Sequence, residues 1–326
     1  MSKRLKDKHK AVSLVSGGLD SQLAAKLVSD QGIEVIGVNF RTGFTTGEED
    51  KLFDRIETEI GIEVRKLQVD ESKYLEIIKS PEHGYGSAMN PCIDCRVLVL
   101  QLAKDYMREI SADFVITGEV LGQRPMTQRS QAMKLVKRKS GLADRLLRPL
   151  SAKSLDPTLP EKKGWVDREK LLDIKGRSRE IQLELAEELG IDTYSQPAGG
   201  CLLTEEEFGH RLQELFDRKG REEVSLDDVK LLRHGRHFRL IGGSKAIIGR
   251  NKGENKQLDR FSSRYWKVRV TDFPGPITLV SENASSEELV LAARLTARYS
   301  QGRDADKLKV TAEKDGETNF YEVTPI

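Results

Sequence analysis

The sequence has little cysteine and no long apolar run. Its 326 residues include three cysteines, Cys92, Cys95 and Cys201. A small and odd number of cysteines argues against a disulfide framework. No apolar stretch approaches the roughly 18 residues of a membrane-spanning helix, and no apolar segment typical of a signal peptide follows the basic start of the chain. We therefore expect a cytoplasmic chain without a membrane partner.

A large excess of one charge is also missing from the chain as a whole. The net charge is +2, although 33% of the residues are charged and 37% are hydrophobic. The length suggests two domains. The charge is uneven, because residues 231–270 hold eleven Lys/Arg against two acidic residues, and residues 124–153 hold nine against one. Two separate basic stretches favour a polyanionic partner over a merely solubilising surface.

A Walker A phosphate loop is absent, because G-x-x-x-x-G-K-[ST] occurs nowhere in the sequence. A different glycine turn, SGGLDS, stands at residues 16–21. The apolar run at 11–15 before it predicts a buried strand, and the spacing of apolar residues at 22–28 after it predicts a helix. The unit is therefore a strand, a glycine turn and a helix.

The residues of this turn are suited to binding a nucleotide. Glycines allow a phosphate to approach the backbone, and a helix start presents unpaired N–H groups with a partial positive charge. Serine hydroxyls add donors, and the carboxylate of Asp20 can hold Mg²⁺. The SGGxDS string resembles the PP-loop of the ATP pyrophosphatases, and the resemblance implies that ATP is cleaved between its α- and β-phosphates. It assigns ATP to Ser16, Gly17, Gly18, Leu19, Asp20 and Ser21.

Strand and helix patterns alternate along the first half of the chain. Further strands are predicted at residues 34–40, 64–69, 114–118 and 146–150. This order is typical of an α/β fold with a doubly wound parallel sheet. Ligands bind beyond the carboxyl ends of such strands, so we assign Phe40 and Gly118 to the nucleotide site as well, with Phe40 lining the adenine pocket.

The pattern changes after residue 220. Shorter strand candidates surround one helix at 285–299, which predicts a smaller α+β domain. We expect a catalytic PP-loop domain at residues 1–220 and a second domain at residues 221–326.

The three cysteines form the second motif. An Asn-Pro pair at 90–91 predicts a helix start, which places Cys92 and Cys95 in the first turn, on one face. A helix N-terminus lowers the pKa of a cysteine, and Arg96 would add to this effect, so thiolates are predicted. Cys201 follows a glycine turn that allows close approach to a ligand. This pattern favours metal or redox chemistry over three unrelated buried cysteines.

The cysteines alone leave the metal open. Zinc usually takes four ligands, so the set is one short, and none of the five histidines is obviously placed to complete it. An iron–sulfur cluster held by three thiolates would keep one iron open. A cysteine persulfide would need no metal.

Three strings in this order, SGGLDS, NPCIDCR and PAGGC, resemble the PP-loop tRNA thiolation enzymes, which include 2-thiouridylases and 4-thiouridine synthetases. The resemblance covers about residues 10–215. In 2-thiouridylases an aspartate stands at the place of Cys92, and only two catalytic cysteines occur. The third cysteine brings the chain closer to thiolases with a three-cysteine [4Fe–4S] cluster. The resemblance implies that Asp20, Cys92, Cys95 and Cys201 are catalytic and that the three cysteines are the metal ligands.

The segments GRHFRL at 235–240 and IIGRN at 247–251 resemble the RNA-binding domain of the NFACT proteins. Four aromatic residues are candidate stacking surfaces for bases: His237, Phe238, Tyr265 and Trp266. The basic residues offer contacts to phosphates, and we expect these to bind RNA: Arg236, Arg239, Arg250, Lys252, Arg264 and Lys267.

Together the motifs predict an ATP-dependent tRNA sulfurtransferase that adenylates a uracil carbonyl and replaces its oxygen with sulfur. Its partners would be tRNA and a sulfur donor, which is sulfide, a sulfur carrier or a cysteine desulfurase. A homodimer is possible. Two rival functions are a PP-loop amidating or ligating enzyme with structural zinc, and a non-enzymatic RNA-binding protein.

Overall fold

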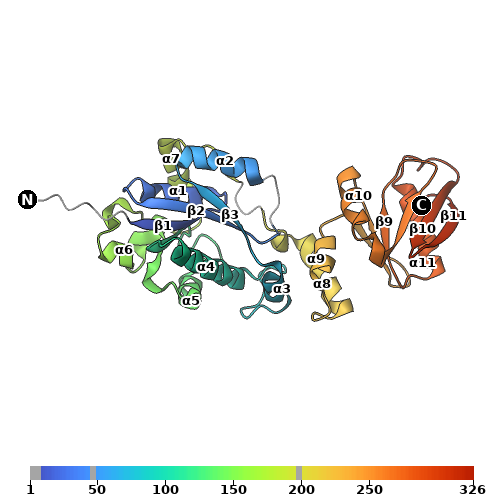
Figure 1. Ribbon diagram of the computed structural model, residues 1–326, viewed down its shortest axis with the longest axis horizontal. Coiled ribbons are helices and arrows are strands. Elements are labelled where there is room, and N and C mark those ends of the chain that lie inside the picture. The colour runs from blue at the N-terminus through green and yellow to red at the C-terminus, as the bar shows by residue number, and fades with distance from the viewer. Residues whose placement is uncertain (1–8, 45–48, 196–199) are drawn as a thin grey trace, which may run out of the picture. The chain divides into compact units, whose positions relative to one another are not determined.

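The computed structural model describes residues 9–44, 49–195 and 200–326. Contacts divide the chain between Asp217 and Arg218 into two units, shown from blue to yellow and from yellow to red in Figure 1. Each unit has its own sheet and its own core. The functional assignment of residues 1–220 and 221–326 to two domains stays a prediction.

The N-terminal unit is built on a five-stranded sheet. Every paired strand in it is parallel, and the order is β3-β2-β1-β4-β5. The predicted doubly wound α/β fold is therefore confirmed. Strands β2 and β3 are added on one side of β1 and strands β4 and β5 on the other, so the carboxyl ends of β1 and β4 form the switch point where such folds bind ligands. The strands are β1 (Lys10–Leu14), β2 (Glu34–Arg41), β3 (Val64–Gln68), β4 (Phe114–Thr117) and β5 (Leu146–Leu147).

Helices cover both faces of this sheet (Figure 1). One core packs Leu23 and Ile56 from α1 and α2 against the sheet, and the other packs Leu100 and Val136 from α4 and α5. Residues 154–163, which look like a loop in the sequence, contain the short helix α6. The helices are α1 (Leu19–Ser29), α2 (Glu49–Ile60), α3 (Glu71–Lys79), α4 (Cys92–Glu109), α5 (Ser130–Ser140), α6 (Leu159–Lys162), α7 (Glu180–Leu189) and α8 (Glu206–Lys219).

The C-terminal unit is a six-stranded sheet in which every paired strand is antiparallel, in the order β11-β10-β8-β9-β7-β6. Helix α11 packs its apolar side on one face of this sheet. The predicted smaller α+β domain is confirmed. Its elements are α9 (Leu226–Leu231), β6 (Arg236–Arg239), β7 (Lys245–Ile248), α10 (Lys252–Asp259), β8 (Tyr265–Val270), β9 (Thr278–Ser281), α11 (Ser286–Arg298), β10 (Leu308–Lys314) and β11 (Glu317–Val323).

Within the described ranges, no helix combines the length and the apolar character that crossing a membrane requires.

Candidate nucleotide and thiol site

The turn between β1 and α1 lies at the switch point of the parallel sheet. Gly17 has a φ of +84°, which favours glycine, and its carbonyl accepts a hydrogen bond from the N–H of Ser195 at 2.9 Å. Helix α1 begins at Leu19, and the first N–H groups of a helix have no partner inside it. The turn therefore offers the helix start that suits a phosphate.

Two serines of the turn hold its shape. The Oγ of Ser21 accepts a hydrogen bond from the N–H of Ser16 at 3.2 Å and donates to the carbonyl of Gly18 at 2.7 Å. The side chain of Leu19 is buried in the core beside α1. The structure thus uses the Ser21 hydroxyl inside the turn, whereas Ser16 is exposed, and only the backbone of Leu19 is suited to a ligand.

The carboxylate of Asp20 is held by two amides. The side chain of Gln123 donates to its Oδ2 at 2.7 Å, and Gln182 on α7 donates to its Oδ1 at 3.5 Å. Gln182 also donates to the Oε1 of Gln123 at 3.2 Å. The two amides orient the carboxylate at the edge of the sheet, where its oxygens are of the ligand type that Mg²⁺ prefers.

Two buried polar atoms at the start of α7 have no hydrogen-bond partner, the Oε1 of Gln182, whose amide also contacts Asp20, and the Nε of Arg179. Arg179 precedes Gln182 by three residues, so the two lie on the same side of the start of α7. A buried guanidinium nitrogen without a partner is suited to an anion. The sequence analysis missed Gln123, Gln182 and Arg179.

Gly118 and Phe40, which the sequence analysis assigned to the nucleotide site, both have packing roles in the structure. A Cβ at Gly118 would lie 2.3 Å from the carbonyl oxygen of Asp20, so only glycine allows the end of β4 to pack against α1. Phe40 packs against the core on the α4 side of the sheet. Contact of either residue with ATP stays a prediction.

The three cysteines come from two places in the unit. Helix α4 begins at Cys92 with Pro91 as its N-cap, one residue later than the sequence suggests. The amide of Asn90 donates to the Sγ of Cys92 at 3.0 Å, and the hydroxyl of Tyr74 donates to the Sγ of Cys95 at 3.4 Å. Tyr74, on α3, is a site residue that the sequence analysis missed.

Cys201 lies near Tyr74, the residue that contacts Cys95. The residue after it donates its N–H to the carbonyl of Phe44 at 2.9 Å, and the ring of Phe44 lies 5.5 Å from the ring of Tyr74. Pro197, Ala198 and Gly199 of the predicted glycine turn lie outside the described residues. Phe44 thus connects the Cys201 segment to the tyrosine that contacts Cys95.

The prediction of lowered thiol pKa values is wrong for two cysteines. Burial raises the pKa of Cys95, and the hydrogen bond from Tyr74 and the charge of Arg96 only partly oppose this. Burial raises the pKa of Cys201 to about 12, and Cys95 and Cys92 add to the rise. Desolvation outweighs the helix dipole, so these thiols are neutral until a cation binds them.

The mutual electrostatic effect of the three thiols means that they are neighbours. Among the described residues, however, the three sulfurs do not form a group with all atoms within 4.8 Å of one another. Three thiolates on one tetrahedral zinc, at about 2.3 Å each, would stand about 3.8 Å apart. Thiolates that bind different irons of one cluster stand farther apart. The described positions of the three sulfurs therefore do not match the spacing of ligands on one tetrahedral zinc ion.

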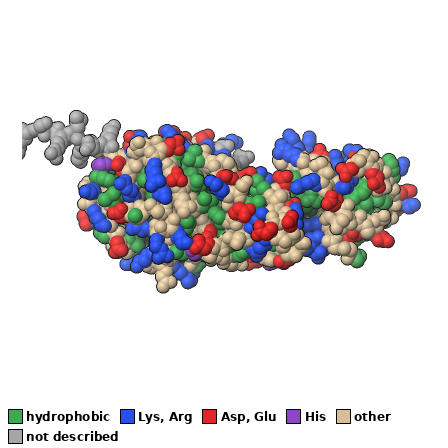
Figure 2. Space-filling view, turned by 60° about the horizontal axis from the view of Figure 1, so that its bottom comes forward, with side chains coloured by type: hydrophobic (Ala, Val, Ile, Leu, Met, Phe, Trp, Pro, Cys, Tyr) green, Lys and Arg blue, Asp and Glu red, His purple; other side chains and the backbone are tan. Residues whose placement is uncertain are grey.

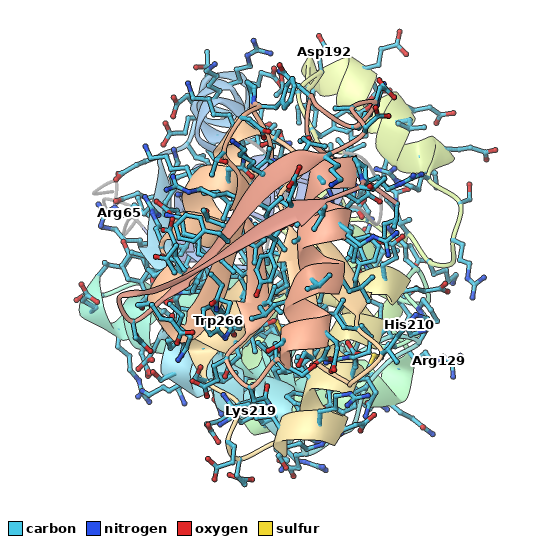
Figure 3. All side chains as sticks on the ribbon, turned by 90° about the vertical axis from the view of Figure 1, so that its right-hand side faces the viewer. Arg65, Arg129, Asp192, His210, Lys219 and Trp266 are labelled. Carbon is cyan, nitrogen blue, oxygen red and sulfur yellow. The ribbon has the colours of Figure 1, made fainter. Side chains whose placement is uncertain are left out.

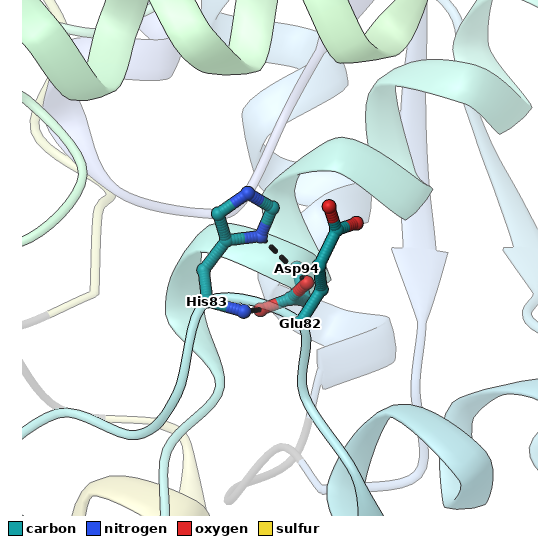
Figure 4. A group of neighbouring side chains, drawn as sticks. All are labelled: Glu82, His83 and Asp94. Carbon is teal, nitrogen blue, oxygen red and sulfur yellow. Dashed lines mark hydrogen bonds and ion pairs between the residues drawn. The ribbon is translucent and has the colours of Figure 1, made fainter.

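A separate group of Glu82, His83 and Asp94 has metal-ligand geometry (Figure 4). The ring of His83 points toward Asp94, with its Nδ1 2.9 Å from the Oδ1, and Glu82 forms an ion pair with Lys139 at 2.5 Å. Each of these side chains has a protein partner, which explains the group without a metal ion.

Glu119, at the switch point, is 1% exposed and lies between two arginines. Its Oε1 is 2.9 Å from Arg96 and its Oε2 is 2.8 Å from Arg148, and Thr117 donates to it. Burial opposes ionisation, but the two arginines outweigh it and lower the pKa of Glu119 to about 2. This carboxylate fixes the residue that follows Cys95.

One segment connects the two halves of the site. Gln123 bonds to Asp20, and Met126 receives a weak hydrogen bond to its sulfur from Asn90 at 3.9 Å. Asn90 in turn bonds to Cys92. The segment after β4 therefore connects the carboxylate of the glycine turn to the thiols.

Most of the predicted RNA-binding residues have partners in the C-terminal unit. Arg264 lies 3.8 Å from Asp227, Lys267 2.7 Å from Asp259 and Arg250 3.5 Å from Glu254. Arg239 donates to the carbonyl of Gly243, and Arg236 lies over the ring of Tyr299. Positive and negative side chains are intermixed over this unit in Figure 2. Lys252 is exposed.

The four aromatic residues considered for stacking are also engaged. Trp266, labelled in Figure 3, is 9% exposed and its indole N–H donates to the carbonyl of Glu282 at 3.2 Å. Phe238 packs against Tyr299, Tyr265 packs against the core beneath α10, and a ring nitrogen of His237 lies 2.8 Å from a backbone carbonyl. Trp266 is therefore buried, and the other three rings are half-buried.

Comparisons with known families agree with this division of the chain. Residues 7–156 match the family described as Thiamine biosynthesis protein (ThiI), and residues 235–326 match the NFACT protein RNA binding domain. The chain is therefore similar to PP-loop enzymes of the ThiI type in its N-terminal unit and to the NFACT RNA-binding domain in its C-terminal unit. Cys92 and Cys95 lie inside the matched residues, whereas Cys201 lies outside both ranges.

The chain is similar to curated tRNA-specific 2-thiouridylases named MnmA. The protein from Ligilactobacillus salivarius is 26% identical over 323 residues, which cover 93% of this chain and 78% of the relative. The protein from Clostridium perfringens (strain 13) is 26% identical over 298 residues, with 83% and 74% covered.

Two solved structures resemble parts of the chain. A 4-thiouridine synthetase–RNA complex with bound ATP is 19% identical, with a TM-score of 0.41 over 69% of this chain and 52% of the other. The U34-tRNA thiolase NcsA from Methanococcus maripaludis with its [4Fe-4S] cluster is 20% identical, with a TM-score of 0.37 over 71% and 75%. At these TM-scores neither likeness carries a functional conclusion.

Proposed function

We propose that this ATP-dependent tRNA sulfurtransferase adenylates a uracil carbonyl at Asp20 and delivers sulfur from Cys92, Cys95 and Cys201. The observation that carries the proposal is the segment after β4, which contacts both parts of the site. Its Gln123 donates a hydrogen bond to Asp20, and its Met126 accepts one from Asn90, which also donates to Cys92. It supports one active site made from the glycine turn and the thiols. ATP would lie on residues 16–21, with Mg²⁺ at Asp20.

The reaction balances without an outside oxidant or reductant. The uracil oxygen attacks the α-phosphorus of ATP, the bond to the bridging oxygen breaks, and pyrophosphate leaves while the ring nitrogen beside the carbonyl gives up its proton. Hydrosulfide then attacks the carbonyl carbon, AMP leaves with the electron pair of the carbon–oxygen bond, and the sulfur proton ends on that nitrogen. The base must leave any stacked helix for this.

The thiols would hold the sulfur-delivering group. A [4Fe–4S] cluster bound by three thiolates supplies an iron with an open position that suits a sulfur ligand. The sulfur spacing, which does not match the ligands of one tetrahedral zinc ion, supports this group over zinc. Tyr74 would orient Cys95, and Asn90 would orient Cys92. The sulfur donor would be sulfide, a sulfur carrier or a cysteine desulfurase, and persulfide sulfur from a desulfurase would first take two electrons from a pair of thiols that becomes a disulfide.

The PP-loop unit offers its own surface for the tRNA backbone. Lys134 and Arg138 lie four apart on α5 and share one face, and Arg124 and Arg129 precede the helix. All four are exposed, and in the part of the chain that the structure describes none forms an ion pair. Figure 2 shows Lys and Arg side chains on the side that carries α5, and Arg129 points outward in Figure 3. Along the chain, α5 comes directly after the segment whose Met126 contacts Asn90, the partner of Cys92.

Cysteine variants prepared without oxygen test the proposal. We expect Cys92→Ser, Cys95→Ser and Cys201→Ser each to lose iron, acid-labile sulfide and tRNA thiolation together, because all three thiols would bind the same cluster. Ser87→Ala, on the exposed segment before α4, is the matched control and keeps all three.

Three outcomes would contradict the proposal. Full thiolation by an iron-free Cys92→Ser protein would leave a two-cysteine persulfide route. Zinc in place of iron, with pyrophosphate release but no thiolation, would indicate an amidating or ligating enzyme. RNA binding without pyrophosphate release would indicate a non-enzymatic RNA-binding protein. A homodimer and a cytoplasmic location stay predictions.

A further inference from the structure

The C-terminal unit exposes an aromatic residue that the sequence analysis did not single out. Phe320 on β11 is 79% exposed, more than any other aromatic ring among the described residues. Strand β11 is an edge of the six-stranded sheet. The four aromatic residues that the sequence suggested for stacking are buried or half-buried, and the next most exposed rings of the unit are Phe273 at 40% and Tyr299 at 37%, so Phe320 is the most open ring among the described residues.

The strand register places Phe320 on the face opposite α11. Its neighbour Tyr321 and Val310 contribute to the core beneath α11, and successive residues of a strand point to opposite faces. Thr311 pairs with Phe320 on one side and with Arg269 on the other. One row therefore crosses this face from Arg269 through Thr311 to Phe320.

Most charged side chains around Phe320 form ion pairs, and one lysine nearby has no ion-pair partner in the described residues. Arg269 is bonded to Glu313 at 3.1 Å, and Glu322 lies 3.7 Å from Lys307. Lys309 pairs in register with Glu322, which places it diagonally beside Phe320, and it is exposed with no ion pair in the described residues. The hydroxyl of Thr311 also lacks a hydrogen-bond partner.

We propose that Phe320 is a stacking platform for an unpaired base of the bound RNA, with the adjacent phosphate on Lys309. An aromatic ring on a sheet face accepts any base, because every base has a flat apolar face. The mostly paired charges mean that stacking, rather than counterion release, supplies the affinity at this place. The inference rests on the proposed RNA-binding role of this unit.

The full-length chain tests this by fluorescence anisotropy with a labelled oligouridine RNA at several salt concentrations. Base–aromatic stacking contributes about 1–3 kcal/mol, so we expect Phe320→Ala to bind about 5- to 150-fold more weakly. The slope of log affinity against log salt should stay at its wild-type value, because no phosphate contact is removed. Phe320→Trp should keep the wild-type affinity.

Ile241→Ala is the matched control, since Ile241 is 97% exposed and apolar on the same unit but cannot stack. We expect it to bind like the wild type. Wild-type affinity in Phe320→Ala, or an equal loss in Ile241→Ala, would overturn the platform. A lower molecular mass of Phe320→Ala in sedimentation would also overturn it, because Phe320 would then be covered by a second copy of the chain. A wild-type chain that binds no RNA would overturn the RNA-binding role itself.

Discussion

The two units place their basic residues differently. In the PP-loop unit, Arg124, Arg129, Lys134 and Arg138 are exposed and, in the described ranges, form no ion pair. In the C-terminal unit, four of the eleven cations of the more basic stretch 231–270 pair with carboxylates: Arg250, Arg264, Lys267 and Arg269. Part of the positive charge of stretch 231–270 is therefore neutralised within the fold, whereas the four cations named in the PP-loop unit have no carboxylate partner in the described ranges.

The difference shows what a charge count along the sequence omits. Asp227 and Asp228 precede the stretch 231–270, and Glu313 follows it, yet the fold places them beside Arg264 and Arg269. A count within a window treats these cations as free. Around α5 the same happens at Lys139, which pairs with Glu82 from outside the stretch, whereas Lys134 and Arg138 on the same helix have no carboxylate partner in the described ranges.

The largest expected effect separates chemistry from RNA binding. We expect Asp20→Ala to abolish pyrophosphate release and to leave tRNA affinity unchanged, because Asp20 lies in the glycine turn and apart from the cations of α5. Asp30→Ala, at the other end of α1 where Asp30 pairs with Lys26 at 2.7 Å, is the control and should keep both properties. Pyrophosphate release by Asp20→Ala would remove the nucleotide site from this turn.

The next largest effect concerns the stability of the fold and the buried ion pair between Glu119 and Arg148. Glu119→Gln leaves Arg148, which is 5% exposed, without its carboxylate. Removing one partner of a buried ion pair costs about 3–5 kcal/mol, so urea unfolding should show a loss of this size. Glu34→Gln, which breaks the exposed pair with Lys10 at 2.8 Å, should cost about 1 kcal/mol or less. Equal losses would mean that burial of Glu119 does not matter.

The same carboxylate predicts a pH dependence. The pKa of Glu119 is about 2 in the folded chain, below its ordinary value of 4.5. A carboxyl group whose pKa is lowered by folding stabilises the folded state at any pH above its pKa in the unfolded chain. This stabilisation is lost as the pH falls from about 4.5 toward 2. Unfolding midpoints across this range should fall more steeply for the wild type than for Glu119→Gln.

Much of the fold was predictable from local patterns. Strands buried on both faces of a parallel sheet are continuous apolar runs, so the runs at 11–15 and 114–118 predicted β1 and β4. Helices α5 and α10 were missed, because α10 buries only Leu258 and α5 only Met133, Val136 and Ser140. Such short, charged segments leave little periodicity to detect.

The candidate site divides in the same way. The glycine turn and the cysteines are short strings, so the sequence alone pointed to them. Gln123, Gln182 and Tyr74 act on residues far away in the chain, and only the fold brings them together. The thiol pKa values were misjudged for the same reason, since burial comes from distant elements and the helix dipole is local.

A pair of double variants tests the comparison of the units directly. Each phosphate contact contributes about 0.7–0.9 to the slope of log affinity against log salt, so Lys134→Ala with Arg138→Ala should lower the tRNA slope by about 1.4–1.8. Arg264→Ala with Lys267→Ala should lower it less, because both cations already have carboxylate partners. Equal changes, measured by anisotropy with the full chain, would mean that RNA displaces those carboxylates.

The smallest effect concerns Lys252, which differs from the other five predicted RNA-binding residues in having no partner within the described ranges. Lys252 stands at the start of α10, is exposed, and has no ion pair in the described residues. The start of a helix favours an anion, so Lys252→Ala should lower the slope by about 0.7–0.9, as for one phosphate. Lys256→Ala is the matched control, because Lys256 is equally exposed one turn further along the helix, away from its start. An equal change in both variants would mean that charge alone, and not its place at the helix start, attracts the RNA.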